Sequence, residues 1–172
     1  MDRTEWVNQL EALHHRIRER EPVSEADLAW YRAGRAALLS TAVEVQAVAL
    51  ASEARRRSTI RIARPAQVLL EARGWSVQTL TVDLGAGGFA ALLEAPPPVE
   101  EWIRATLLLP GDGPLITTVA VADARPVSGL VRVAFRFSEP AEEVQRRVED
   151  YVMDSVLEQL VFWDDVLEKL RV

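Results

Sequence analysis

Apolar residues recur every three or four positions near the start of the chain, which places them on one face of an α-helix. The members of this stripe are Trp6, Leu10, Leu13 and Ile17. Pro22 should end the helix, because the residue before a proline is disfavoured in the α conformation. Ser24, with Asp27 three positions later, suits the first turn of a second helix. The pattern therefore predicts a helical hairpin over residues 1–54.

Beyond Pro65 the helical spacing gives way to short apolar runs bounded by glycine or proline. Six β-strands are predicted, at Ala66–Ala72, Trp75–Asp83, Phe89–Glu94, Ile103–Leu109, Leu115–Arg125 and Leu130–Ser138. Their connections are shorter than the roughly dozen residues that a parallel crossover needs, so we expect antiparallel hairpins. Six short antiparallel strands with turns at regular intervals are typical of a small β-barrel.

The last part of the chain, residues 140–171, again shows helical spacing. Its apolar ladder consists of Val148, Val152, Val156, Leu160, Trp163, Leu167 and Leu170. A stripe this wide either packs against the N-terminal hairpin or forms the seam of a homodimer, and the two do not exclude each other. The predicted fold class is therefore α+β, a six-stranded antiparallel barrel with an N-terminal helical hairpin and a long C-terminal helix.

Composition narrows the possible chemistry, because the chain has 172 residues, a formal net charge of −6 and no cysteine. The lack of cysteine excludes disulfides, thiolate zinc sites and cysteine nucleophiles. The negative charge argues against DNA or RNA as a partner. No apolar run approaches the roughly 18 residues that span a bilayer, and no signal peptide is visible. We therefore expect a cytoplasmic protein without a membrane partner.

The two histidines of the chain are His14 and His15, on the first predicted helix. Adjacent positions point about 100° apart around a helix, so these side chains cannot converge on one metal ion. No nucleophile motif or carboxylate spacing completes an active site with either of them. We predict that both lie on the exposed surface of the helix, and that the chain is not an enzyme and holds no metal.

One short segment is cationic, since residues 51–73 carry six arginines against two acids. Nineteen of the twenty basic residues are arginine, so only their clustering is informative. Arg57 and Arg61 stand four positions apart, just before the first predicted strand. A glycine-rich turn, Asp83-Leu84-Gly85-Ala86-Gly87-Gly88, follows the second strand. This turn lacks the Gly-Lys-Ser/Thr of a phosphate-binding P-loop, and by itself it indicates a tight hairpin.

Together, and in this order ahead of a barrel, the two segments resemble the signature of the PilZ family, R-x-x-x-R followed by [D/N]-x-S-x-x-G. The tract from Leu80 to Phe89 is particularly similar to myxobacterial paralogues, which tend to carry a helical N-terminal extension. The resemblance covers about residues 55–160. It implies a split β-barrel and a receptor for cyclic di-GMP (c-di-GMP), a ligand with two guanines and two phosphodiesters.

Carried over by position, the resemblance makes Arg57 and Arg61 the motif arginines and Arg56 an additional ligand contact. Arginine suits this role because its planar fork can grip a phosphate or the edge of guanine and its face can stack on the base. Asp83 would accept hydrogen bonds from guanine N–H groups. Gly88 would let the turn pass close to the ligand.

Gly85 is a departure, because it stands where the motif has serine. Losing one hydroxyl contact would cost about 0.5–1.5 kcal/mol, or roughly three- to tenfold in affinity. Glycine also makes the free loop looser. The expected ligand-binding set is Arg56, Arg57, Arg61, Asp83, Gly85 and Gly88, with c-di-GMP as the ligand and no other cofactor.

These expectations divide the chain into a helical hairpin (1–54) and a PilZ-like domain (55–172) that begins with an arginine-rich strap (55–65). Ligand binding would order the strap, reorient the second helix and so change a homodimer or the surface for an unidentified protein partner. The resemblance implies an output in motility, pili or exopolysaccharide. The alternative is a degenerate adaptor that binds no nucleotide and acts through protein–protein interaction or oligomerisation.

Overall fold

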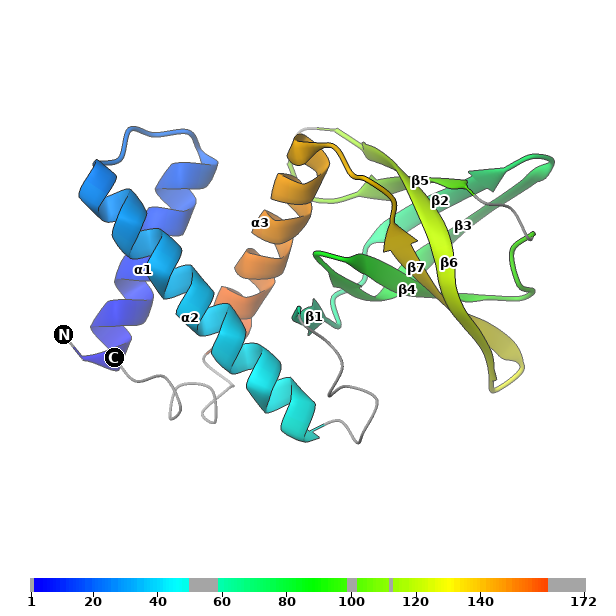
Figure 1. Cartoon of the computed structure of the whole chain (residues 1–172), viewed down its shortest axis with the longest axis horizontal. Coiled ribbons are helices and arrows are strands. Elements are labelled where there is room, and N and C mark those ends of the chain that lie inside the picture. Colours follow the sequence, from blue (N-terminus) through cyan, green and yellow to red (C-terminus); the bar gives the residue numbers. More distant parts are fainter. Residues whose placement is uncertain (1, 50–58, 99–101, 112, 161–172) are drawn as a thin grey trace. The chain divides into compact units, whose positions relative to one another are not determined.

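The computed structural model describes residues 2–49, 59–98, 102–111 and 113–160 (Figure 1). The helices in these ranges are α1 (Arg3–Arg18), α2 (Glu25–Ala49) and α3 (Glu142–Gln159). The strands are β1 (Arg61–Ile62), β2 (Gln67–Ala72), β3 (Trp75–Gly85), β4 (Gly88–Leu93), β5 (Ile103–Leu108), β6 (Leu115–Val127) and β7 (Leu130–Phe137).

The predicted α+β fold is confirmed, and strands β2 to β7 match the six predicted strands to within two residues at either end. The short strand β1 is an addition that the sequence did not reveal. Two residues show no periodicity, so β1 is recognisable only through its antiparallel pairing with the end of β3.

The barrel is an antiparallel sheet in the order β3-β2-β5-β6-β7-β4, closed by the pairing of β4 with β3. Strand β3 is long enough to pair with β2 along one part and with β4 along another, and this closes the barrel. Its first half pairs with β2, over Trp75 to Leu80. Its end, Leu84-Gly85, pairs with β1 on one side and with β4 on the other.

Alternating side chains point into the barrel, as a period of two along each strand requires. The core is centred on three aromatic rings, with centroid distances of 5.1 Å for Phe89–Phe135 and 6.0 Å for Phe89–Phe137. All three side chains are buried. The residues of β7 that alternate with buried Val133, Phe135 and Phe137, among them Arg132 and Arg136, therefore belong to the outer face of the barrel.

The chain divides into two compact units, a helical unit (Met1–Ile60 with Asp154–Val172) and a barrel unit (Arg61–Met153). Helix α3 therefore begins in the barrel unit, and its residues from Asp154 onward belong to the helical unit. The sequence-based division assigned the whole C-terminal helix to the barrel domain. Its boundary at residue 54 lies outside the described residues and stays a prediction.

Within the helical unit, α1 and α2 form the predicted hairpin (Figure 1). The N-terminus of α2 is capped as expected, since Ser24 Oγ accepts a hydrogen bond from the Asp27 backbone at 3.1 Å and donates one to its carboxylate at 2.7 Å. Gly34 lets the two helices approach closely. A Cβ at this position would lie 3.1 Å from Leu10 Cδ1 and 3.2 Å from Trp6 Cζ2.

The prediction that both histidines are exposed is wrong for His14, which is 3% exposed, and holds for His15. His14 Nδ1 lies 2.6 Å from the Tyr31 hydroxyl of α2, and Nε2 lies 3.0 Å from Asp154 Oδ1 of α3. His14 follows Leu10 by four positions, so it continues the apolar stripe into the interior. The sequence pattern could not show that α2 and α3 supply polar partners for His14 in the interior.

Asp154 also accepts a hydrogen bond from Arg18 Nη1 at 2.8 Å, so this carboxylate ties the end of α3 to α1. Burial alone would raise the pKa of Asp154. The hydrogen bonds and charges of His14 and Arg18 outweigh burial and hold that pKa below its usual range. Of the two arrangements left open for the C-terminal helix, packing against the hairpin is therefore observed, while the homodimer stays a prediction.

None of the helices in the described ranges is long and apolar enough to cross a membrane.

Candidate functional site

The end of β3 brings the predicted aspartate to the outer face of the barrel. The pairing of β3 with β4 shifts register between Thr81 and Asp83, as a β-bulge does, and Asp83 then stands opposite Ala90. Strand β1 places Arg61 opposite Gly85, two residues beyond Asp83 along β3. Residues two apart on a strand share a face, so Arg61 and Asp83 project from the same side of the sheet.

Asp83 lies between two arginines. Its Oδ1 is 2.6 Å from Arg61 Nη1, and its Oδ2 is 2.5 Å from Arg132 Nη2. The three side chains, here called the Asp83 cluster, are partly buried, with 23% of Arg61, 16% of Asp83 and 16% of Arg132 exposed. The two guanidinium groups place cationic hydrogen-bond donors on a surface that water reaches, which suits an anion.

The glycine-rich turn closes the β3–β4 hairpin, with Gly85 paired opposite Gly88. Gly88 has φ of +146°, and a Cβ there would lie 2.0 Å from the carbonyl oxygen of Phe135. Glycine is therefore required at this position for strand packing, whatever the turn binds. Gly85 is buried in the ladder between β1 and β4, which fixes the backbone at the position where the motif has serine.

The other arginines of the cationic segment 51–73 are placed differently. Arg56 and Arg57 lie outside the described residues. Arg64, three positions after Arg61, lies over the ring of Tyr151 in α3, with its guanidinium carbon 5.2 Å from the ring centroid. The structure thus brings together Arg61, Asp83 and the glycine turn, while Arg64 reaches towards the helix.

The model of the PilZ domain matches residues 55–154, more than half of the chain. The chain belongs to the PilZ domain family. The match begins at the arginine cluster and takes in all seven strands. Among curated proteins, none matches the sequence.

Solved PilZ proteins share the fold. Escherichia coli YcgR in complex with c-di-GMP is 20% identical, with a TM-score of 0.52 over 64% of this chain and 50% of that chain. The MrkH–c-di-GMP complex of K. pneumonia is 18% identical, with a TM-score of 0.52 over 61% of this chain and 53% of that one. The Bacillus subtilis inhibitor of motility MotI/DgrA is 21% identical, with a TM-score of 0.50 over 62% and 52%. The chain thus covers about half the length of these proteins.

In this PilZ domain, Arg132 is the site residue that sequence reasoning missed. It falls outside both motif segments, 49 positions from Asp83, and reaches it by extending across β4, which pairs with β3 on one side and with β7 on the other. The alternation of β7 already places Arg132 on the outer face. The register of the closed barrel, which the sequence does not reveal, supplies its partner.

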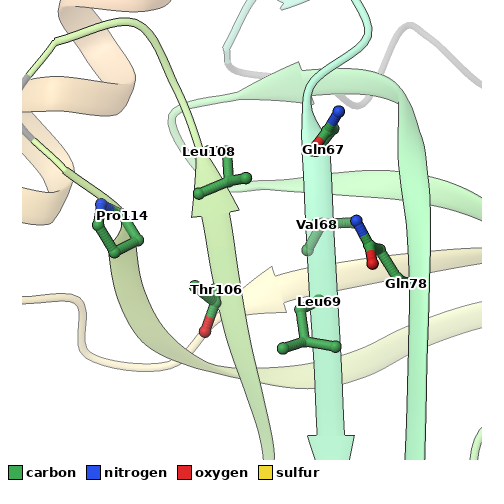
Figure 2. A pocket seen from close by; sticks show the side chains of 7 residues that line it. All are labelled: Gln67, Val68, Leu69, Gln78, Thr106, Leu108 and Pro114. Carbon is green, nitrogen blue, oxygen red and sulfur yellow. The ribbon is translucent and has the colours of Figure 1, made fainter.

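A second feature of the outer face is an open hollow of about 280 Å³ over β2 and β5 (Figure 2). Its lining residues are Gln67, Val68, Leu69, Gln78, Thr106, Leu108 and Pro114. All of these are uncharged and none belongs to the Asp83 cluster, so the hollow offers no counter-charge to a phosphate. Nor do the described residues of this PilZ domain contain a group of three or more potential metal ligands.

Proposed function

We propose that this chain is a c-di-GMP receptor that binds the nucleotide on the outer barrel face, at Arg61, Asp83 and the Gly85–Gly88 turn. One observation carries the proposal. The motif arginine and the motif aspartate, 22 positions apart, meet at 2.6 Å in a partly exposed cluster that also contains Arg132. Membership of the PilZ family and the c-di-GMP complexes of YcgR and MrkH support this choice of ligand.

The side chains of the cluster suit both the phosphodiesters and the guanines of c-di-GMP. Arg61 supplies a planar pair of donors for a phosphodiester or for the O6 and N7 atoms of guanine. The carboxylate of Asp83 can accept from guanine N–H groups, and such charge-assisted bonds are stronger than neutral ones. Arg56 and Arg57 would add donors from the strap, as the family motif implies. The role is that of a receptor, which acts by binding and needs no catalytic residue.

We further propose that binding is transmitted through Arg64 and Tyr151. Arg61 and Arg64 are three residues apart, so a ligand that draws Arg61 away from Asp83 pulls on the segment that holds Arg64 over the Tyr151 ring. Asp154 follows Tyr151 by three positions in α3, where it binds His14 and Arg18 of α1. Because α3 begins in the barrel unit and its residues from Asp154 onward belong to the helical unit, this helix would carry the change along the chain, and so to a protein partner or second copy. A receptor of this kind would act in the cytoplasm, which stays a prediction.

The alternative, an adaptor that binds no nucleotide, has its own support. Gly85 lacks the hydroxyl of the motif serine, and the outer barrel face exposes large apolar side chains. Leu80 is 52% exposed, and Leu108 and Ile116 are each 49% exposed. Solvent exposure of this kind is typical of a surface that contacts another protein.

Isothermal titration calorimetry with c-di-GMP, and with GMP for comparison, tests the receptor. We expect saturable binding of c-di-GMP that Arg61→Ala weakens at least about tenfold, because a charge-assisted contact is lost. Arg104→Ala removes the same charge from the exposed outer face of β5 and should leave the affinity unchanged. Absence of any heat or thermal shift with the wild-type protein at millimolar nucleotide would favour the adaptor.

Hydrogen–deuterium exchange tests the transmission. With saturating c-di-GMP, we expect exchange in α1 and α2 to change in the wild-type protein and to stay constant in Tyr151→Leu, which keeps an apolar side chain but loses the aromatic ring. Binding itself should survive this substitution. Helices whose exchange does not respond to bound ligand in the wild-type protein would contradict the proposed coupling.

A further inference from the structure

Arg132 holds one oxygen of the Asp83 carboxylate while Arg61 holds the other. The family motif accounts for Arg61 and Asp83 and leaves Arg132 without an assigned role. Yet the two arginines are almost equally close to the carboxylate, at 2.6 Å and 2.5 Å, and Arg132 is the less exposed of the two. The function of this second contact is therefore open.

The backbones that carry the two arginines differ in how firmly they are held. Arg61 lies in a two-residue strand that pairs with β3 alone among the described strands. Arg132 lies inside β7, which pairs with β4 over Leu93 to Gly88 and with β6 over its whole length. A strand bonded on both sides opens far less readily than a short one bonded on one side. Arg61 is thus the arginine that can move, and Arg132 is the one that stays.

The reach of Arg132 to Asp83 depends on small residues between them. Strand β4 separates β3 from β7, and adjacent strands lie about 4.8 Å apart, so Arg132 must extend across roughly 10 Å of sheet. The β4 residue opposite Asp83 is Ala90, and Ala90 in turn stands opposite Ala134 of β7. These two methyl groups leave the path along the surface clear for a long side chain.

We infer that Arg132 is a positioning residue, which fixes the Asp83 carboxylate so that it can read guanine while Arg61 turns to the ligand. This inference rests on the proposed function. When Arg61 leaves Asp83 for a phosphate or a base, a partly buried carboxylate would lose half of its partners, and such a loss is costly. Arg132 keeps Oδ2 occupied throughout. Oδ1, released by Arg61, is then free to accept a guanine N–H from a fixed direction.

A positioning role of Arg132 affects which nucleotide is preferred, whereas a contribution to stability or to overall charge does not. Guanine offers N1–H and N2–H donors to a carboxylate, whereas adenine has no donor at the corresponding N1 and C2 positions. Loss of Arg132 should therefore reduce the preference for c-di-GMP over cyclic di-AMP. Loss of a mere positive charge would weaken both dinucleotides by the same factor, since their phosphates are identical.

The test is calorimetry of wild type, Arg132→Gln, Arg132→Lys and Arg104→Gln with both dinucleotides. We expect Arg132→Gln to weaken c-di-GMP about tenfold and to lower the c-di-GMP preference by a similar factor, because a charge-assisted contact to Asp83 is gone. Arg132→Lys keeps a donor and should retain part of the preference. Arg104→Gln removes the same charge from β5 and should behave as wild type. In an Asp83→Asn background, Arg132→Gln should have little further effect, because it acts through Asp83.

Other outcomes would overturn the inference. Equal weakening of both dinucleotides, additive with Asp83→Asn, would make Arg132 a general charge. Affinities like those of Arg104→Gln would leave it without any role in binding. If Arg132→Gln fails to fold, as judged by circular dichroism, Arg132→Lys with both ligands decides, and a preference equal to wild type then counts against positioning. If the wild-type protein binds neither dinucleotide, the proposed function itself fails and takes this inference with it.

Discussion

Two carboxylates, Asp83 in the barrel unit and Asp154 in the helical unit, are each held between two cationic or N–H-bearing side chains. Asp83 has two arginines, both permanently charged, on a surface that water reaches. Asp154 has Arg18 and His14, and His14 is buried and also bonded to Tyr31. Asp83 therefore lies between two permanent cations at the surface, whereas Asp154 lies between a surface arginine and a buried imidazole.

The difference separates a site for binding from a site for stability. Arginines at the surface attract an anion and can exchange a contact within the protein for a contact with a ligand. A buried imidazole with both nitrogens engaged links α1 to α2 and to the end of α3, and removing it takes one hydrogen bond from Tyr31 and one from Asp154. The following predictions test this contrast, beginning with the largest expected effect.

Gly88→Ala should disrupt the packing of β4 against β7, on the barrel face that carries the Asp83 cluster. The new Cβ would lie 2.0 Å from the carbonyl oxygen of Phe135, and the φ of +146° is one that alanine rarely adopts. We expect a loss of about 3 kcal/mol in the free energy of unfolding, measured with urea, because β4 and β7 must separate. Gly87→Ala is the matched control, since a Cβ there meets no heavy atom within 4 Å beyond its chain neighbours. Equal stability of the two variants would contradict the packing requirement.

His14→Leu should destabilise the protein without affecting the nucleotide site. The substitution leaves the Tyr31 hydroxyl and Asp154 short of a partner, at a cost of about 2 kcal/mol in the free energy of unfolding. His15→Leu, one position along on the exposed surface, should change it by less than about 0.5 kcal/mol. Affinity for c-di-GMP should be unchanged in both variants. A loss of c-di-GMP affinity in His14→Leu but not in His15→Leu would contradict a purely structural role for the contacts of His14.

Asp83→Asn should show the opposite profile. We expect an affinity loss of at least about tenfold by calorimetry, because a neutral amide replaces the charged acceptor for guanine. The two freed arginines can reach water, so the loss of unfolding free energy should be about 1 kcal/mol and smaller than for His14→Leu. Glu94→Gln removes a negative charge from an exposed position and serves as the control. If Asp83→Asn unfolds more easily than His14→Leu and still binds, the assignments of the two clusters are reversed.

The smallest effect concerns acid stability. Because the pKa of Asp154 is depressed in the folded protein, its contribution is fully present above the unfolded-state pKa of about 3.9 and is lost as the pH falls through the folded value. Unfolding at pH 6 and at successively lower pH below 4 should therefore show wild type losing more stability than Asp154→Asn. Glu11→Gln, which removes an exposed carboxylate of α1, should follow the wild-type profile. Parallel profiles for wild type and Asp154→Asn would contradict the depressed pKa.

The sequence predicted the barrel well because each strand reports its own geometry. The alternation of Val133, Phe135 and Phe137 with outward residues marks β7 as half-buried, Gly129 precedes its start and Pro140 follows its end. Strand β1 has only two residues and no pattern of its own, so it went unrecognised. A long strand shows a clear alternation of apolar and polar residues, whereas a strand of two residues shows none.

Side chains that meet across the fold were harder to predict. Arg61 and Asp83 came from a family motif, whereas Arg132 depends on which strands neighbour each other in the closed barrel. The prediction that His14 lies on the surface was wrong. A polar side chain is expected to be exposed unless it has buried partners, and the partners of His14, Tyr31 and Asp154, come from other helices. Whether Arg56 and Arg57 join the site stays a prediction, since both lie outside the described residues.

The assignment of the end of α3 to the helical unit has a consequence for synthesis. Asp154 follows its partners Arg18 and His14 by 136 and 140 positions. At the usual rate of about 5–20 residues per second, the ribosome would add it roughly 7–30 seconds after them. During that interval the nascent α1–α2 hairpin presents a buried-type histidine without its carboxylate, while the barrel sequence emerges behind it. The α1–α2 hairpin is therefore translated before the barrel but completed after it.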